Sequence, residues 1–334
     1  MSTDPDPLLL VCGADENYAR PLAVTLYSAL LNLEDEGPVR LYVVDGGIRP
    51  ESKRRLESVV ESSPPRVDLQ WARADMSLVE DLPTYEWINT TTYLRLLIPE
   101  IVPDHFGKAL YLDSDLQVEA SLSALWTEDL DGHPLAAVQA YGTPYVSFPL
   151  GIQKYEDFGL PPDTPYFNAG ILLLDLDQWR RDDIAQQVFT YLRDYRESVQ
   201  MTDQDGLNAV LATDWKPLDL SWNVMSHLLR FERWPDSRFK ERVAPRRTQL
   251  LTNPKIYHFA GETKPWHVES DHPAQFDWLR YLWTSGWFSP AERLRWFGRW
   301  IARYVWWRLR DRTRPLRHEL ARRSPPPIST MLMR

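Results

Sequence analysis

The chain has 334 residues, of which 43% are hydrophobic and 25% are charged, and its net charge is −9. This is the composition of an ordinary globular protein that is large enough to bury a substantial core. Its single cysteine, Cys12, excludes an internal disulfide framework and a multi-cysteine zinc site. Because Cys12 lies in an apolar run, we expect a buried and unreactive thiol.

The charge is unevenly distributed. Residues 291–334 contain twelve arginines, no lysine and three acidic residues, a charge of +9 that leaves −18 on the rest of the chain. We therefore expect no nucleic-acid binding by the acidic main body. Acidic residues interrupt the N-terminus before any leader-like apolar region, and no uncharged stretch reaches the roughly 20 residues that span a bilayer. A cytoplasmic location is expected.

The first 75 residues predict strands and helices in alternation. Strands are expected at 8–12, 40–44 and 66–71, with helices at 18–33 and 50–62 between them. This order is typical of a parallel, doubly wound sheet with right-handed crossovers.

The rest of the chain continues this α/β pattern. Further strands are expected at 108–112, 135–139, 168–176 and 255–259, and helices at 90–97, 177–198 and 203–212. The predicted fold class is therefore α/β, with an open and mostly parallel sheet.

The most informative segment follows the strand at 108–112. Asp113 and Asp115 are two positions apart, so both carboxylates share one face of an extended segment and could reach one cation. Polar groups at the end of such a strand face the ligand site of an open α/β sheet. Hard oxygen ligands suit a divalent metal that bridges to phosphates. An exposed Asp-Ser-Asp turn is the alternative.

The first strand ends in the turn 13–18. Gly13 lets a ligand approach the backbone there, and Asp15 could accept a hydrogen bond from a ring N–H or a ribose hydroxyl. Helix capping by Asp15 or Asn17 is the alternative. The turn lacks the three-glycine dinucleotide signature, which disfavours an NAD-binding fold.

His258 ends the last predicted strand. An imidazole beside two carboxylates favours Mn²⁺ over Mg²⁺. Gly261 would let a backbone N–H reach a phosphate, and Lys264 would place a positive charge on it. A solvent-exposed loop with a structural tryptophan is the alternative.

Two further polar segments precede a strand and a helix. Asn168 is either a turn residue or a ligand contact. Capping of the helix by Thr202 would explain Asp203 and Asp205, which lie near the helix dipole, but it would not explain Gln204.

The C-terminal region predicts an amphipathic helix at 292–312. Its apolar stripe consists of Leu294, Phe297, Ile301, Val305 and Leu309, flanked by tryptophans and arginines. Such a helix favours an anionic membrane surface. A helix packed on the main domain and a nucleic-acid-binding tail are the alternatives.

Six segments in order resemble retaining glycosyltransferase family 8, in particular bacterial lipopolysaccharide and lipooligosaccharide galactosyl- and glucosyltransferases. They are Gly13-Ala14-Asp15-x-Asn17-Tyr18, Thr91-Thr92-Tyr93-x-Arg95-Leu96, Tyr111-Leu112-Asp113-Ser114-Asp115, Phe167-Asn168-Ala169-Gly170, Asp203-Gln204-Asp205 and His258-Phe259-x-Gly261-x-x-Lys264-Pro265-Trp266. The resemblance covers about residues 8–267 of the chain.

The resemblance implies a GT-A fold and transfer of galactose or glucose from a UDP-sugar to a saccharide acceptor. Asp113, Asp115 and His258 would bind Mn²⁺, or Mg²⁺ in its place. The nucleotide would be held by Gly13, Ala14, Asp15, Asn17, Gly261 and Lys264. The donor sugar would be held by Arg95, Asn168, Ala169, Asp203 and Gln204.

The catalytic residues that the resemblance implies are Asp203 and Gln204. No strong nucleophile is evident. We expect Gln204 to stabilise the positive sugar ring as a dipole while the acceptor hydroxyl attacks from the leaving-group side. The cation and Lys264 would stabilise the charge that develops on the diphosphate.

Two positions depart from the family pattern. Trp87 stands where some relatives carry a histidine, and Ala140 stands where some carry an aspartate. Both put the sugar and the acceptor in doubt. The alternatives are a nucleotidyl- or phosphotransferase that uses the same metal, and a catalytically silent nucleotide-sugar-binding or scaffold protein.

We expect three regions: a catalytic domain at 8–270, a membrane-associating helical segment at 271–323 and a flexible tail at 324–334. The partners expected are the UDP-sugar, a glycan acceptor that is lipid-linked or part of lipopolysaccharide, and an anionic membrane surface. The protein would lie peripherally on the inner face of the cytoplasmic membrane.

Overall fold

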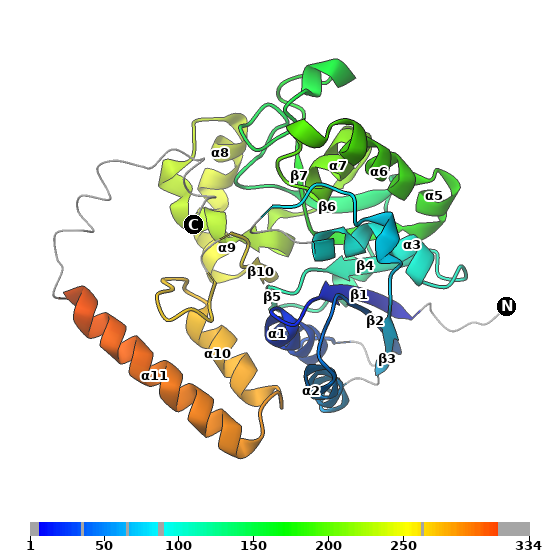
Figure 1. The fold of residues 1–334 in the computed structure, drawn as a ribbon. Coiled ribbons are helices and arrows are strands. Elements are labelled where there is room, and N and C mark those ends of the chain that lie inside the picture. The colour runs from blue at the N-terminus through cyan, green and yellow to red at the C-terminus, as the bar shows by residue number, and fades with distance from the viewer. Residues whose placement is uncertain (1–6, 35–36, 65–66, 86–89, 262–263, 313–334) are drawn as a thin grey trace.

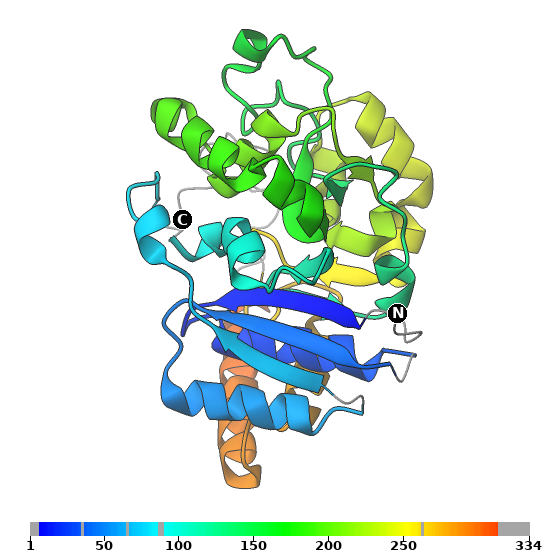
Figure 2. The same cartoon turned by 90° about the vertical axis from the view of Figure 1, so that its right-hand side faces the viewer.

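The centre of the molecule is a seven-stranded sheet (Figures 1 and 2). The computed structural model describes residues 7–34, 37–64, 67–85, 90–261 and 264–312. In spatial order the strands are β3 (Val67–Ala72), β2 (Val39–Asp45), β1 (Leu8–Ala14), β4 (Lys108–Leu112), β7 (Phe167–Asp175), β6 (Leu135–Gln139) and β8 (Lys216–Pro217). The α/β fold class and the strands of this sheet agree with the prediction, except for β8, which was not predicted.

The sheet is mostly parallel, and one of its strands, β7, runs in the opposite direction. β1 pairs in parallel with β2 and β4, and β2 pairs in parallel with β3. β7 runs antiparallel to both of its neighbours, β4 and β6. The reversal places the beginning of β7 beside the end of β4, where the backbone N–H of Asp113 donates to the carbonyl of Gly170 at 2.8 Å.

Helices cover both faces of the sheet (Figure 2). One face carries α1 (Ala19–Leu31), α2 (Pro50–Glu61) and α10 (Gln275–Thr284). The other carries the 3₁₀-helix η2 (Thr90–Leu97) and α3 (Ile98–Ile101), α5 (Leu176–Arg181), α6 (Ile184–Asp194) and α7 (Asp203–Val210). Within β1, Leu10 and Cys12 enter the first core and Leu9 and Val11 enter the second. A strand buried on both faces is apolar throughout.

A second sheet of three short strands was not predicted. It consists of β5 (Leu116–Val118), β10 (Ile256–His258) and β9 (Val224–Met225), with β10 between the other two. β10 is antiparallel to β5, and this register pairs His258 with Leu116. The backbone N–H of Phe259 donates to the carbonyl of Asp115 at 3.0 Å. This sheet therefore carries His258 to the acidic segment. The chain also forms three short helices, which are α4 (Ser123–Trp126), α8 (Arg238–Val243) and α9 (Arg247–Thr252).

One predicted helix was wrong. Residues 177–198 form α5, α6 and the short 3₁₀-turn η4 (Arg196–Ser198) instead of one continuous helix. The break lies at Asp183, whose φ of 50° is in the left-handed region and cannot continue a right-handed helix. Aspartate tolerates this conformation better than most residues do.

The helix α11 (Pro290–Arg312) lies along α10 at the edge of the molecule (Figure 1). Phe297 and Trp300 are buried in the same core as Trp278 of α10. One alternative for this helix was packing on the main domain. It is confirmed for the face of α11 that carries Phe297 and Trp300. No helix among the described residues is long and apolar enough to cross a membrane.

The predicted apolar stripe of α11 is divided between the core and solvent. Phe297 is 9% exposed, whereas the exposed fractions of Leu294, Ile301, Val305 and Leu309 lie between 49% and 67%. The predicted tail at 324–334 lies outside the described residues, and the boundary at residue 270 stays a prediction.

Candidate active site

A cavity of about 290 Å³ opens where β1 and β4 end and β7 begins. Most of the residues predicted for the site line it: Gly13, Ala14, Asp15, Arg95, Asp113, Asp115, Asn168, Ala169, Asp203, Gln204 and His258. Three others, Asn17, Gly261 and Lys264, lie outside this lining. Segments far apart in the sequence thus meet at the sheet edge where open α/β folds bind their ligands.

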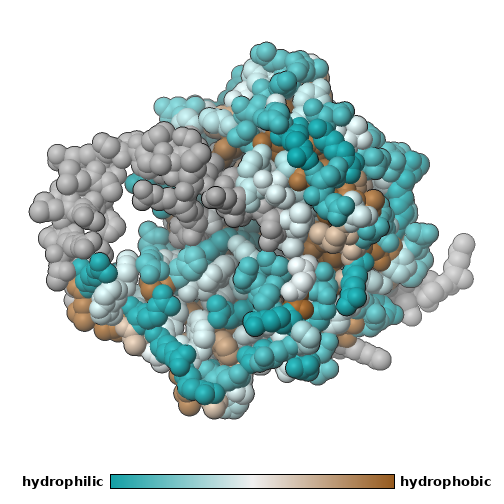
Figure 3. Space-filling view, viewed as in Figure 1, coloured by the Kyte–Doolittle hydropathy of each residue, from teal (hydrophilic) through white to brown (hydrophobic). Residues whose placement is uncertain are grey.

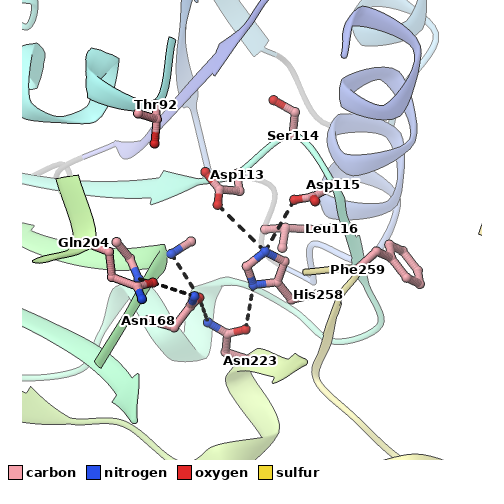
Figure 4. A network of polar contacts seen from close by, with 12 residues as sticks. Thr92, Asp113, Ser114, Asp115, Leu116, Asn168, Gln204, Asn223, His258 and Phe259 are labelled. Atoms are coloured by element: carbon pink, nitrogen blue, oxygen red, sulfur yellow. Dashed lines mark hydrogen bonds and ion pairs between the residues drawn. The ribbon is translucent and has the colours of Figure 1, made fainter. Parts of the chain in front are cut away.

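Asp113, Asp115 and His258 form a candidate metal site (Figure 4). Each offers one ligand atom, and these atoms lie within 4.8 Å of one another. Nε2 of His258 is 3.4 Å from Oδ1 of Asp115 and 3.8 Å from Oδ2 of Asp113. Because Asp115 is only 8% exposed, the alternative of an exposed turn is wrong.

The residues of this site fit a divalent cation. Two carboxylates and one imidazole are a suitable donor set for Mn²⁺ and related ions. Gly170 keeps the space beside them open, since a Cβ at this position would lie 2.3 Å from Cε1 of His258 and 2.8 Å from Oδ2 of Asp113. A side chain there would fill the place that the ligand atoms surround.

Lys264 approaches Asp115 from the other side. Its Nζ donates to Oδ2 of Asp115 at 2.5 Å and to the carbonyl of Phe259 at 2.7 Å. Burial alone would raise the pKa of Asp115, but the charge of Lys264 holds that pKa well below its usual range. Burial lowers the pKa of Lys264, but the attraction of Asp115 outweighs it and leaves the pKa raised. Both groups therefore remain charged as an ion pair.

Arg95 connects two carboxylates of the cavity. Its Nη2 lies 2.9 Å from Oδ1 of Asp113 and its Nε lies 3.0 Å from Oδ2 of Asp203. Nη1 donates to the carbonyl of Ala169, and the guanidinium lies 4.7 Å from the ring centre of Tyr111. The guanidinium therefore orients Asp113 and Asp203, while its predicted contact with the donor stays a prediction.

Asp203 is almost completely buried at the first residue of α7, with 2% of its surface exposed. The hydroxyls of Thr92 and Thr202 both donate to its Oδ1. Across the described part of the chain, no group donates a hydrogen bond of good geometry to its Oδ2. Burial raises the pKa of Asp203, and Arg95 opposes this effect. Asp203 lines the cavity, and a carboxylate in a cavity wall suits a ligand hydroxyl.

Thr202 does not cap α7 as the alternative reading of this segment supposed. Its hydroxyl donates to Asp203 at 3.0 Å, and it makes no capping bond to the helix backbone. Thr202 has a φ of 49°, which is strained for a β-branched residue and costs about 1–3 kcal/mol. This strained residue lines the cavity and directly precedes Asp203.

A chain of side-chain amides links the sugar-binding candidates to His258 (Figure 4). Nδ2 of Asn168 donates to Oε1 of Gln204 at 2.8 Å. Nδ2 of Asn223 donates to Oδ1 of Asn168 at 2.9 Å, and Oδ1 of Asn223 lies 3.0 Å from Nδ1 of His258. Asn223 is completely buried, and its place in the site was not predicted from the sequence. An asparagine flanked by the apolar Trp222 and Val224 was its only signal.

Two tyrosines were also missed as members of the site. The hydroxyl of Tyr111 donates to Oδ1 of Asp113 at 2.7 Å, and that of Tyr166 donates to Oδ1 of Asp205 at 2.6 Å. Oδ2 of Asp205 accepts from the backbone N–H groups of Gln200 and Met201. Asp205 therefore holds the loop before α7. A tyrosine in or beside a buried strand cannot be distinguished from a core residue by pattern alone.

The residues predicted to hold the nucleotide lie at the end of β1 and after β10. Asp15 accepts from the backbone N–H of Tyr18 at 3.0 Å, and Nζ of Lys264 lies 5.7 Å from the ring centres of Tyr18 and Trp266. Gly261 has a φ of 86°, which favours glycine. Asn17 is exposed.

Of the two departures from the family pattern, one can be placed. Ala140 is 4% exposed and packs with Tyr166 and Ile152 in a small core cluster. It does not line the cavity. Trp87 lies outside the described residues.

Comparisons with known proteins agree with this fold. The sequence pattern of glycosyl transferase family 8 matches residues 9–270. General stress protein A of Bacillus subtilis is 29% identical over 281 residues, which are 83% of this chain and 94% of that protein. Lipopolysaccharide 1,3-galactosyltransferase of Salmonella typhimurium is 24% identical over 296 residues, 86% of this chain and 82% of that one. The structure is also similar to that of galactosyltransferase LgtC, solved with donor and acceptor sugar analogs. The two superpose with a TM-score of 0.70 at 26% identity, over 82% of this chain and 95% of the LgtC chain.

Proposed function

The chain belongs to glycosyl transferase family 8, and we propose that it transfers galactose or glucose from a UDP-sugar to a saccharide acceptor, with retention and with a divalent metal. It has the GT-A fold and is a glycosyltransferase. One observation supports metal-dependent transfer from a UDP-sugar most strongly. The candidate metal site of Asp113, Asp115 and His258 shares one cavity with the buried Asp203 and Gln204.

The leaving diphosphate would lie against the end of β4. A divalent cation held by Asp113, Asp115 and His258 would, when bound, offset the negative charge that develops on the departing phosphate. Lys264 is already placed beside Asp115 and would add a second positive charge on the same group. Asp15 and Gly13 at the end of β1 would hold the nucleoside, and Gly261 and Asn17 would complete this part of the site.

The donor sugar would lie toward α7. The carboxylate of Asp203, which lines the cavity, would accept one of its hydroxyls, and Asn168 would contribute a further polar contact. Oε1 of Gln204 already accepts from Nδ2 of Asn168 and from the backbone N–H of Ala169. With both lone pairs engaged, this oxygen is a poor nucleophile, which supports a role for Gln204 as a dipole.

We infer a front-side substitution. The bond between sugar C1 and the diphosphate oxygen breaks, and the acceptor oxygen forms its bond to C1 on the same face. The proton of the acceptor hydroxyl passes to the departing phosphate oxygen. Trapping of a glycosyl adduct on Gln204 by rapid quench and mass spectrometry would contradict this route.

The relatives support the classes of donor and acceptor. The names of two of them include galactosyltransferase, and one of those acts on lipopolysaccharide. We propose a hexose donor and a lipid-linked or lipopolysaccharide glycan as acceptor.

The outer face of α11 supports peripheral attachment to an anionic membrane. Figure 3 shows hydrophobic side chains gathered along this helix, at the lower left. The large apolar side chains that this helix exposes are Leu294, Ile301, Val305, Trp306 and Leu309, all at least 49% exposed. Arg295, Arg299, Arg303, Arg308 and Arg310 lie on the same helix. Apolar and basic residues exposed together suit the interface of anionic lipids, so we propose attachment to the cytoplasmic face.

A donor panel tests the proposed function. The protein is incubated with Mn²⁺ and UDP-glucose, UDP-galactose or their N-acetyl forms, with and without glycan acceptors. We expect slow release of UDP from one hexose donor without acceptor, and faster transfer with retained anomeric configuration, measured by NMR, with acceptor. Tight binding of a UDP-sugar with no turnover would instead identify a silent binding protein.

A further inference from the structure

We propose that Asn223 is a positioning residue that fixes the tautomer of His258, and that the backbone of β7 sets the direction of this contact through Asn168. The inference rests on the proposed function in one respect, the role of His258 as a metal ligand. It adds Asn223, on the 3₁₀-turn η5 (Leu220–Asn223), to the residues on which metal binding depends.

The direction of the amide chain is set by two backbone N–H groups, which can only donate. The N–H of Ala169 donates to Oε1 of Gln204 at 3.0 Å, and the N–H of Gly170 donates to Oδ1 of Asn168 at 3.1 Å. The atoms that they face must therefore be amide oxygens. This settles the orientation of both side chains, since Asn168 then presents its Nδ2 to Gln204.

The orientation of the Asn168 amide determines that of the Asn223 amide. Oδ1 of Asn168 faces Asn223 at 2.9 Å, so the atom of Asn223 on that side must be the donor Nδ2. The oxygen of Asn223 then faces Nδ1 of His258 at 3.0 Å. A neutral His258 must therefore carry its proton on Nδ1.

This tautomer is the one that a metal site needs. With the proton on Nδ1, the lone pair of Nε2 points toward Asp115 and Asp113, 3.4 and 3.8 Å away. A metal-bound histidine commonly donates its other N–H to a neighbouring acceptor, which fixes the ring and strengthens the ligand. Asn223 supplies this acceptor.

Burial prevents the arrangement from relaxing. Asn223 is completely buried and His258 is 3% exposed, so solvent cannot replace a lost partner. Rotating the Asn223 amide would oppose its oxygen to that of Asn168 and its NH₂ group to Nδ1–H of His258. Buried polar groups without partners are costly, so the rotated form is disfavoured.

The test compares two substitutions that distinguish the contact of Asn223 with His258 from its contact with Asn168. Asn223→Asp keeps an acceptor toward His258 but loses the donor toward Asn168, whereas Asn223→Leu loses both. Asn32→Leu serves as the control, because Asn32 donates to the carbonyls of Ser28 and Val118, away from the cavity. The affinity of the full-length protein for Mn²⁺ is measured by calorimetry in the presence of UDP, and folding is followed by thermal unfolding.

We expect Asn223→Leu to weaken Mn²⁺ binding about 10–100-fold. Asn223→Asp and Asn32→Leu should bind Mn²⁺ within about threefold of the wild type, a difference of less than about 0.7 kcal/mol. Equal affinity in the wild type and Asn223→Leu would overturn the inference and leave the proposed function intact.

A second measurement needs no metal. In the metal-free protein, at a pH at which the ring is neutral, ¹H–¹⁵N spectra should show His258 protonated at Nδ1, with the signals assigned by their loss in His258→Gln. Asn223→Leu should lose this preference, and a wild-type ring protonated at Nε2 would overturn the inference. If the wild type shows the Nδ1 tautomer but binds no Mn²⁺, the proposed metal site fails while the tautomer assignment stands.

Discussion

Arg95 and Asp203 face each other in the wall of the cavity, with Nε of the arginine 3.0 Å from Oδ2 of the aspartate. The same guanidinium lies 2.9 Å from Oδ1 of Asp113. One buried side chain therefore orients a ligand of the candidate metal site and a carboxylate proposed to hold the donor sugar. Its planar group with several donors can serve both partners at once.

Arg95→Lys should destabilise the protein strongly. An ammonium group cannot bond both carboxylates and the carbonyl of Ala169 in the geometry of a guanidinium, so at least one buried carboxylate loses its partner. Losing one member of a buried ion pair costs about 3–5 kcal/mol. The free energy of unfolding in urea measures this loss.

Arg193→Lys is the matched control. Arg193 pairs with Asp81, but the two side chains are 36% and 53% exposed. Substitution in such a surface pair should cost less than about 1 kcal/mol. Equal losses in the two variants would show that Arg95 is not a buried organising residue.

Gly170→Ala should impair metal binding without unfolding the sheet. The added Cβ would collide with the ring of His258 and with Oδ2 of Asp113, so both ligands must move. We expect Mn²⁺ affinity to fall about 10–100-fold, the loss typical of a disturbed ligand shell. Calorimetric titration measures it.

The control for this substitution is Gly298→Ala on α11, where an added Cβ meets nothing within 4 Å. It should leave Mn²⁺ binding unchanged and stabilise the protein by up to about 1 kcal/mol, because alanine favours a helix. Unchanged Mn²⁺ affinity in Gly170→Ala would contradict the proposed position of the metal.

Asp205 should make stability depend on pH. Burial raises its pKa to about 6, although Tyr166 and two backbone N–H groups lower it. A folded-state pKa above the unfolded value of about 3.9 means that the folded protein holds the proton more tightly. The contribution of protonated Asp205 to the free energy of unfolding is therefore complete below about pH 4. This contribution is lost as the pH rises to about 6. The loss is about 3 kcal/mol.

Urea unfolding at a series of pH values checks this prediction. Asp205→Asn should lack the loss between about pH 4 and pH 6, although its absolute stability should be lower because the amide nitrogen faces a donor. Asp104→Asn is the control, since Asp104 has a fully exposed side chain. Parallel pH profiles in the wild type and Asp205→Asn would exclude Asp205 as the source.

The exposed face of α11 should direct binding to anionic membranes. Ile301→Asp, Val305→Asp and Leu309→Asp combined remove three exposed apolar side chains and leave the buried Phe297 and Trp300 in place. We expect at least about tenfold weaker sedimentation with phosphatidylglycerol vesicles, with little change in thermal stability.

Substitution is a better test here than truncation, because Phe297 and Trp300 belong to the core. Leu31→Asp, at an exposed apolar position of α1, is the control and should sediment as the wild type does. Undiminished binding by the triple variant would contradict the membrane role of this face.

Much of the fold could be predicted because most strands are apolar runs ending at polar residues. The reversal of β7 could not, since an apolar run carries no direction. This reversal brings Gly170 beside Asp113 and so builds the site. The separation of α5 from α6 was also hidden, because an aspartate is compatible with a helix as well as with the left-handed conformation of Asp183.

The site was predictable where charged residues follow strands, as in Asp113 and Asp115. It was not predictable where a residue acts through a neighbour. Asn223 gains its importance from contacts with Asn168 and His258, which lie 55 and 35 positions away along the chain. Such contacts exist only after the small sheet carrying β10 has formed.

The central claim is that Asp113, Asp115 and His258 hold a metal required for sugar transfer. Release of UDP from UDP-galactose or UDP-glucose, with Mn²⁺ and without acceptor, tests it most directly. We predict release by the wild type, loss of release with a chelator, recovery on addition of Mn²⁺, and at least about 100-fold slower release by Asp113→Asn with its fold retained. Release that is unaffected by the chelator and by Asp113→Asn would contradict the account.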